Sequence, residues 1–356
     1  MMRLSDKLKK LIVLALVFLA GVPLFAFNEK FSYSKGPFFG KNIYPLFLIH
    51  QHLPGTEAAV KQPGAFTLYN TIYYSQAFSI YALKRNENGG YYPAERVVDF
   101  ESFVFESGFS YAVNRNLEIG GIWRIISYYG GFLDAFTQNY HNLFGFPNAG
   151  RELVPQNEVV IDIRTNNGID ITLNHESVGF GDIDLWGKYH FFGNRYVDSA
   201  FQFGIKLPTG NLQQVTGSEA PDFTCGLLLD IYPIKYLSLF FQTGVVVPLN
   251  SIVPAQYRPY PMFNGLAAIE VSPFRFFSIM AQMNIRTSPV TGDNKVVNNL
   301  GIIADKVGSV QTNLLVGVVF QYKQWRFQVY FEEDTFTNTG TDYTICGSVT
   351  TRIKTF

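Results

Sequence analysis

The chain has 356 residues, with 28 basic and 28 acidic side chains and an aromatic content of 16%. A formal charge of zero gives no electrostatic reason to expect nucleic acid as a partner. The two cysteines, Cys225 and Cys346, are too few for a disulfide framework. The length allows one large domain or two ordinary ones.

The chain begins with a basic stretch, MMRLSDKLKK, followed by the apolar stretch LIVLALVFLAGVPLF and the small residue Ala26. This order is typical of a secretory signal peptide. A membrane anchor is the alternative, but the apolar run is about 15 residues, shorter than the roughly 20 that a spanning helix needs. We therefore predict a signal peptide over residues 1–26.

Residues 27–64 contain the stretch GPFFGKNIYPLFLIHQHLP, which is too apolar for a free tail. The sequence predicts that this N-terminal segment packs against the rest of the protein. If the rest is a barrel, the segment is either a plug inside it or a strap across its periplasmic end.

From residue 65 onward, apolar and polar residues alternate with a period of two, the pattern of β-strands with two different faces. In VDSAFQFGIKL, for example, Phe201, Phe203 and Ile205 share one face, and Gln202 and Lys206 share the other. The runs are about 10–14 residues long, which suits strands that cross a bilayer at a tilt. Twelve strands are predicted, at residues 65–83, 95–113, 117–130, 179–192, 196–208, 222–233, 236–248, 260–272, 275–287, 311–323, 325–334 and 343–356.

The predicted connections alternate between short turns and long loops, as in transmembrane β-barrels. This favours an all-β fold, a transmembrane antiparallel barrel over residues 65–356. The longest loop, 131–178, is predicted to lie outside the cell, with an amphipathic helix in FLDAFTQNYHNLFG and a hairpin turned at Asn167-Gly168. If that hairpin entered the membrane, the barrel would have fourteen strands.

The chain ends on an aromatic residue, Phe356, as outer-membrane barrels commonly do. However, the apolar face of the last strand contains Ile345, Val349 and Ile353, one position out of step with Phe356. The last residue therefore fits a barrel without proving it.

Strand parity places charged side chains of both signs on the inner face of the barrel. They would either pair with one another and hold the barrel rigid, or line a path for solute; the two roles are compatible. The residues predicted to line the lumen include Asp182, Asp184, Lys188, Lys206, Arg286, Arg326 and Glu332.

Three segments, GPFFGKNIYPL, GFGDIDLWGKY and KLPTG, resemble an uncharacterised outer-membrane family, domain of unknown function 3187. The last two are also similar to predicted transporters encoded with phenol-degradation pathways. The resemblance implies a Gram-negative outer-membrane barrel and implies no substrate. The motif positions include Gly36, Pro37, Asn42, Pro45, Gly179, Gly181, Asp182, Pro208, Thr209 and Gly210.

No motif predicts catalysis, a cofactor or a metal. Gly179 and Gly181 precede a strand, whereas a phosphate-binding loop precedes a helix. Asn174, His175, Glu176 and Ser177 are close in the sequence, but adjacent residues on a strand or loop point apart, so this closeness gives poor support for catalysis. The histidines lack partners at ligand spacing.

The sequence thus predicts a protein of the cell outer membrane, surrounded by lipid and inserted by the barrel-assembly machinery. The preferred function is a narrow passive channel, porin-like, for a small solute or apolar ligand. A surface protein with an adhesive or structural role is the alternative, and an outer-membrane hydrolase is a more remote one.

Overall fold

The computed structural model describes residues 32–85, 91–145, 148, 150–164, 170–249, 259–290, 310–334 and 340–354. The predicted signal peptide and the final residue, Phe356, lie outside these ranges.

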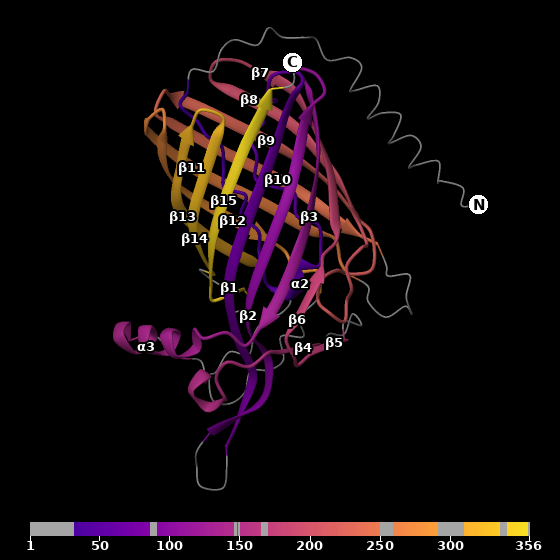
Figure 1. The fold of residues 1–356 in the computed structure, drawn as a ribbon, viewed down its shortest axis with the longest axis vertical. Helices are drawn as coiled ribbons and strands as arrows, with labels where there is room; N and C mark the ends of the chain where they lie inside the picture. The colour runs from indigo at the N-terminus through magenta and orange to yellow at the C-terminus, as the bar shows by residue number, and fades with distance from the viewer. Residues whose placement is uncertain are drawn as a thin grey trace, which may run out of the picture.

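Twelve of the strands in these ranges form one closed antiparallel barrel, as predicted (Figure 1). Each strand pairs with the next, and the ring closes where β1 meets β15, from Ala65 opposite Lys354 to Gln76 opposite Tyr343. The strands of the ring are β1 (Ala65–Arg85), β2 (Tyr91–Ala112), β3 (Leu117–Tyr129), β7 (Ile183–Gly193), β8 (Val197–Leu207), β9 (Asp222–Ile234), β10 (Leu237–Pro248), β11 (Met262–Phe274), β12 (Phe277–Arg286), β13 (Gln311–Tyr322), β14 (Trp325–Asp334) and β15 (Tyr343–Lys354).

The short connections gather at one end of the barrel and the long ones at the other (Figure 1). We call these the short-turn end and the long-loop end. At the long-loop end β1 and β2 continue beyond the ring as a hairpin, with Arg85 opposite Tyr91. The connection predicted between the first two strands, residues 84–94, is therefore too long, because β1 and β2 stay paired well past the barrel rim.

Three further strands lie at the long-loop end: β4 (Val160–Arg164), β5 (Asp170–Leu173) and β6 (Ser177–Phe180). The β4–β5 hairpin pairs with β2 only at Val98 and Asp99, so it lies outside the ring. The alternative of fourteen barrel strands is wrong, and the predicted turn at Asn167-Gly168 falls outside the described residues.

The strand predicted over 179–192 is broken into β6 and β7 at Gly181 and Asp182. The Gly181 amide still bonds to the Arg124 carbonyl oxygen at 2.9 Å, so the chain stays against β3 through the break. Period-two alternation continues across this point, which is why the sequence did not reveal it.

The two faces of the wall differ as the alternation predicts. On β8, the Phe201 and Phe203 side chains face outward and are exposed, while Gln202 and Lys206 face inward and are buried. Cys225 is exposed and Cys346 is buried, and neither forms a disulfide. Apolar side chains therefore cover the outside of the barrel, and polar ones cover the inside.

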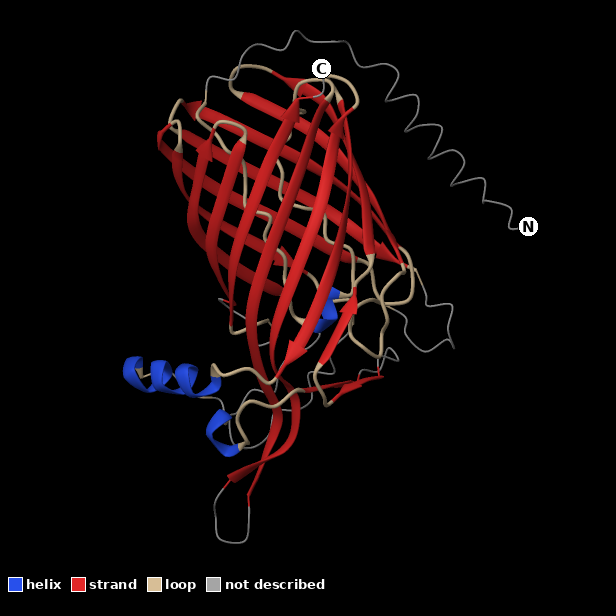
Figure 2. Ribbon diagram, in the orientation of Figure 1, coloured by secondary structure: helices blue, strands red, loops and turns tan. Residues whose placement is uncertain are grey.

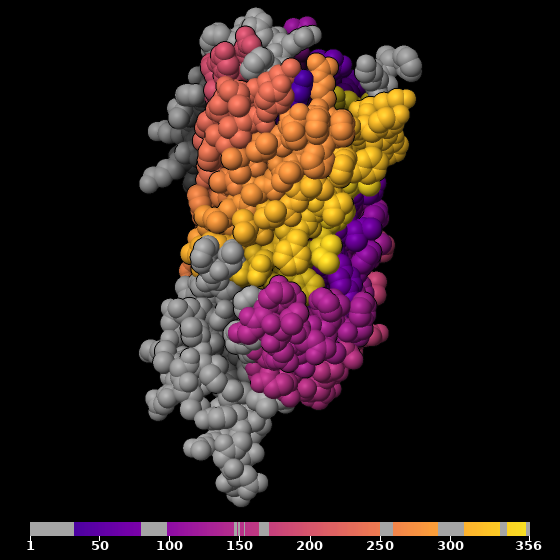
Figure 3. Space-filling view, turned by 90° about the vertical axis from the view of Figure 1, so that its left-hand side faces the viewer, coloured from indigo at the N-terminus to yellow at the C-terminus, as the bar shows by residue number. Residues whose placement is uncertain are grey.

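The helices are short: α2 (Pro45–Leu48), α3 (Asp134–Phe144) and the 3-10 turn η1 (Arg151–Leu153). Helix α3 confirms the amphipathic helix predicted in the long loop, and it extends sideways from the long-loop end. In Figure 3 the magenta side chains of this region stand out below the wall formed by the yellow C-terminal strands. None of the described helices has the length and apolar character needed to cross a membrane.

Candidate functional site: the occupied lumen

Residues 32–64 run inside the barrel (Figure 2). At the short-turn end, the Tyr33 amide donates to the Lys235 carbonyl oxygen at 3.0 Å. The chain then rises to α2 near the long-loop end and returns to the start of β1 at Ala65. We call residues 32–64 the plug. Its rising limb is the segment from the short-turn end to α2, and its descending limb is the segment from α2 back to β1.

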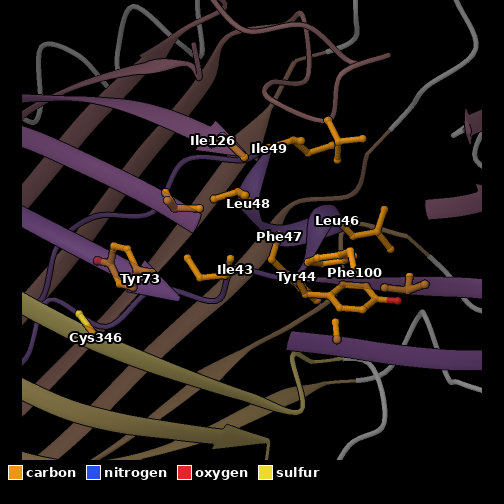
Figure 4. Close-up of a cluster of buried hydrophobic side chains, with 14 of the residues drawn as sticks. Ile43, Tyr44, Leu46, Phe47, Leu48, Ile49, Tyr73, Phe100, Ile126 and Cys346 are labelled. Carbon is orange, nitrogen blue, oxygen red and sulfur yellow. The ribbon is translucent and has the colours of Figure 1, made fainter. Parts of the chain in front are cut away.

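The part of the plug nearest the long-loop end, which we call its top, is apolar. All four residues of α2 are buried, and Pro45 occupies its first turn, where a missing N–H costs nothing. Leu46, Phe47 and their neighbours belong to a buried cluster that also includes Phe100 of β2 and Ile126 of β3 (Figure 4). The apolar stretch of the N-terminal segment thus forms a small core inside an otherwise polar lumen.

Four cations predicted to line the lumen donate hydrogen bonds to carbonyl oxygens of the plug. Each comes from a different strand, so the plug is held from several sides. The bonds join Arg326 to Gly36 and Pro37 (2.8 and 2.9 Å), Arg286 to Phe47 and Gln51 (3.2 and 3.0 Å), Lys206 to Ile49 (2.6 Å), and Lys188 to Glu57 and Ala59 (2.7 and 3.1 Å).

Carboxylates of the wall accept hydrogen bonds from amides of the plug in the same way. They join Glu270 to the amide of Lys35 (3.0 Å), Asp222 to that of Gln51 (2.7 Å) and Asp230 to that of Ala58 (2.7 Å). A buried segment without strand partners would otherwise leave backbone donors and acceptors unpaired. The charged lining therefore supplies the partners that a sheet would give.

Aromatic contacts hold the rising limb. The Phe38 ring stacks on Tyr330, with centroids 4.5 Å apart, and Phe39 stacks on Tyr69 at 5.3 Å. At the short-turn end the Lys235 Nζ lies 4.6 Å from the Tyr33 ring centroid. These contacts add packing energy to the polar ones.

Charges of the wall also pair with one another. Glu106 of β2 accepts from Lys41 of the plug at 3.1 Å and from Arg124 of β3 at 2.9 Å, and Arg124 also pairs with Asp184 of β7. Glu118 pairs with Lys188 at 3.0 Å. Arg124 of β3 therefore joins charges of the two neighbouring strands, and Glu118 and Lys188 form a separate pair.

Asp182, at the break between β6 and β7, holds the loop that follows β8. Its carboxylate accepts from the amides of Gly210 and Ser218, at 2.7 and 3.3 Å, and lies 2.9 Å from Lys206 Nζ. A Cβ at Gly217 would lie 2.4 Å from an oxygen of this carboxylate, so only glycine fits. The GDI and KLPTG motifs therefore meet at one point in space.

The loop held by Asp182, residues 208–221, folds inward over the long-loop end of the lumen. It begins at Pro208, and the Thr209 hydroxyl donates to the Gly181 carbonyl oxygen at 3.0 Å. Val215 is fully buried with φ of +57°, an unusual conformation for a β-branched residue. The Tyr128 hydroxyl donates to the Val215 carbonyl oxygen at 3.0 Å. This loop and α2 together cover the lumen at its long-loop end.

The other motif positions also lie at close contacts. Gly36 has φ of +80°, and a Cβ there would lie 2.5 Å from Glu57 Cγ. The Asn42 side chain donates to Gln311 at 3.3 Å and to Asn313 at 3.4 Å. Gly179 lies in β6, opposite Ile126. The motifs thus mark where the plug and the inward loop join the wall.

Several hollows remain beside the plug. One, of about 60 Å³, lies among Asn42, His52, Gln242 and Arg286, where Gly226 and Gly244 leave the wall without side chains. Another, of about 160 Å³, lies nearer the short-turn end. The lumen is therefore narrowed by the plug without being completely filled.

Glu332 differs from the other predicted lining residues. It is buried on the inner face of β14, and neither carboxylate oxygen has a hydrogen-bond partner among the described residues. The structure does not bring it to the plug backbone.

Sequence reasoning did not single out the amide side chains that hold the plug. Gln282 accepts from the Phe38 amide at 2.9 Å, Gln242 donates to the Thr56 carbonyl oxygen at 2.6 Å, and Gln328 donates to that of Pro37 at 3.1 Å. Strand parity places them on the same face as the charges, so parity was the signal that could have found them.

Within the described ranges, no three His, Cys, Asp or Glu side chains are grouped as a metal site requires. His50 is paired with Asp222 at 3.2 Å, and His190 with Asp198 at 3.0 Å. His50 therefore joins the plug to the wall, whereas His190 joins two neighbouring strands of the wall.

Comparison with known proteins identifies the family. Residues 12–291 match the family described as Protein of unknown function (DUF3187). The chain belongs to this family. No match was found among curated proteins.

Solved structures of outer-membrane proteins resemble this DUF3187 protein to different degrees. A COG4313 outer membrane channel from Pseudomonas putida F1 matches with a TM-score of 0.57 and 10% identity, covering 85% of this chain and 100% of that one. The Pseudomonas putida toluene transporter TodX gives a weaker match, with a TM-score of 0.37 and 9% identity over 90% of this chain and 99% of that one. The likeness to the COG4313 channel, at 10% identity, concerns the fold alone.

Proposed function

We propose that this protein is a narrow outer-membrane channel for the passive movement of small solutes, with residues 32–64 as its gate. The observation that carries the proposal is how the plug is held. Side chains of the wall bond to its backbone, and no strand pairing fixes it. Such contacts can be exchanged for water one at a time, whereas a strand ladder must break as a unit.

The exterior of the barrel supports a membrane location. Exposed apolar side chains follow one another around the wall, among them Phe203, Phe241 and Val329. Such a surface requires lipid around it. The predicted signal peptide and the fold shared with an outer membrane channel point to the outer membrane, with the short-turn end toward the periplasm.

The lumen supports a small solute. Twelve strands enclose a space between that of filled eight-strand barrels and that of open sixteen-strand porins. The plug narrows this space, and the hollows beside it within the barrel include two of about 60 and 160 Å³. Acids and bases are closely matched in number along the lining, so we expect weak ion selectivity rather than a strong preference for one sign.

Single-channel recording in planar bilayers tests the proposal. The full chain should show small, infrequent conductance steps, and a chain lacking residues 28–60 should show larger and more frequent ones. Replacing Lys206 or Arg326 by Glu should shift ion selectivity toward cations, because each change reverses a charge in the lumen.

A reversible lock removes the risk that truncation disturbs folding. The Ser32 and Ser238 hydroxyl oxygens are 2.9 Å apart and join the plug to β10. The double variant Ser32→Cys, Ser238→Cys should conduct less when oxidised and recover when reduced, and each single variant serves as its control. If all forms stay electrically silent and pass no solute into liposomes, the channel proposal is wrong.

A further inference from the structure

A cavity of about 160 Å³ lies between the plug and the wall toward the short-turn end. One side of it is aromatic. Phe39 of the plug stacks on Tyr69 of β1, and Trp186 Nε1 donates to the Tyr69 hydroxyl at 3.3 Å. Three ring systems therefore form a continuous apolar wall whose polar atoms are already paired.

The other side of the cavity is cationic. Six cations line it, namely Lys35, Lys61, Lys188, Lys323, Arg326 and Arg352, against two carboxylates, Glu57 and Glu118. Glu118 is paired with both Lys188 and Lys61, at 3.0 and 3.5 Å. The lining thus has four more positive than negative charges, in a lumen where the two signs are otherwise closely matched.

Two neighbouring donors in this lining have no partner among the described residues. Arg326 Nε is buried and makes no hydrogen bond, although Nη2 of the same guanidinium is bonded to the plug. Thr350, which faces Arg326 across the β14–β15 ladder, has a buried hydroxyl that is also unpaired. Arg352, two residues after Thr350, is exposed and lines both this cavity and the hollow that opens at the short-turn end. Buried polar groups without partners are costly, so Arg326 Nε and the Thr350 hydroxyl indicate a missing acceptor.

The cavity can be reached from the short-turn end. A larger hollow of about 630 Å³ shares Ser34, Glu57 and Arg352 with it and extends to the turn residues Arg115 and Asn194. A small molecule could therefore enter or leave without displacing the apolar top of the plug.

We propose that this cavity binds a small aromatic carboxylate. The ring would lie against Phe39, Tyr69 and Trp186, and the carboxylate would face Arg326, Thr350 and Arg352. Guanidinium groups suit carboxylates, because their planar donors match the two oxygens. The volume is below the roughly 300 Å³ at which drug-sized pockets begin, which limits the ligand to about one ring.

That such a carboxylate is the solute carried by the channel rests on the proposed function. Its binding to the cavity does not require conduction. Isothermal titration calorimetry on the full chain in detergent, at pH 7, is the test. Benzoate should bind. Benzyl alcohol, which has the ring without the carboxylate, and acetate, which has the carboxylate without the ring, should each bind at least about tenfold more weakly.

Variants test the cationic side. Arg352→Gln and Thr350→Val should each weaken benzoate binding by about tenfold. Neither residue holds the plug backbone. Arg195→Gln is the matched control, because Arg195 belongs to a turn at the same end and lines neither hollow, and it should bind benzoate as the parent does.

The alternatives give different results. Equal binding of benzyl alcohol would show an apolar pocket, and equal binding of acetate would show a general anion patch; either overturns the proposal. Unchanged affinity in Arg352→Gln also overturns it. If the protein conducts but does not bind benzoate, the binding site is wrong and the channel proposal stands. If it binds benzoate but does not conduct, the site stands and the channel proposal is wrong.

Discussion

The Arg286 guanidinium holds the plug where α2 ends, because its two Nη groups donate to the carbonyl oxygens of Phe47 and Gln51. We expect Arg286→Met to keep the side-chain length and lose both bonds. A charge-assisted bond contributes about 2 kcal/mol, so losing even one would lower the ratio of docked to displaced plug about thirtyfold. More frequent opening in single-channel recordings is the measurement.

Arg195→Met provides the control for that prediction, since Arg195 lies on an exposed turn between β7 and β8, at the opposite end of the barrel from α2. Unchanged opening in Arg286→Met would mean that the apolar packing of α2 alone holds the top of the plug.

Asp182 offers a second test at the level of one residue. Asp182→Asn removes the charge that pairs with Lys206 and weakens the bonds to the Gly210 and Ser218 amides. We expect hydrogen exchange at these two amides to become at least tenfold faster, because the loop 208–221 opens more often. Glu176→Gln, an exposed carboxylate near β6, should leave their exchange unchanged. Equal exchange in both variants would show that Tyr128 and the buried Val215 hold the loop without Asp182.

Among the elements, α3 presents an apolar face that nothing in the described residues covers. Phe136, Tyr140 and Leu143 are exposed on one side of the helix, and Asp134 is buried on the other. The helix leaves the barrel sideways at the long-loop end, close to the apolar exterior of the wall. We expect it to lie on the membrane surface with this face toward lipid.

Spin labels on the two faces of α3 measure its position. A nitroxide at Phe136→Cys should be relaxed mainly by oxygen, which concentrates in lipid, and one at Asn142→Cys mainly by a water-soluble nickel complex. Equal access of the nickel complex to both labels would place α3 in water.

The barrel strands were predictable from the sequence because lipid and the lumen impose opposite polarities on alternate residues. The break at Gly181 and the inward path of residues 208–221 were not, since both depend on long-range bonds from the single carboxylate of Asp182. For the site, parity identified the wall cations. It could not reveal that their partners are carbonyl oxygens of the plug, because backbone acceptors leave no trace in residue type.

On the scale of the whole molecule, the wall and the plug depend on different interactions. The wall is held by backbone ladders around the closed ring, which do not titrate. The plug is held largely by charged side chains. Its His52 is half-buried, and burial, together with Arg286 and Lys41, lowers the pKa of His52 to about 3 despite the opposing effects of Glu106 and a backbone bond to Gly40. Burial likewise lowers the pKa of His50.

This difference predicts an acid-sensitive gate in an acid-stable barrel. Between about pH 6.5 and pH 3 a displaced plug binds a proton at His52 that the docked plug excludes, so docking weakens as the pH falls through this range. At pH 4.5 the ratio of docked to displaced plug should be up to about 100-fold lower than at neutral pH. Conductance should therefore rise on acidification, while the heat-modifiable gel mobility of the folded barrel stays the same. His52→Gln cannot take up this proton and should reduce the rise; a rise of the same size in that variant would place the pH sensor elsewhere in the lumen.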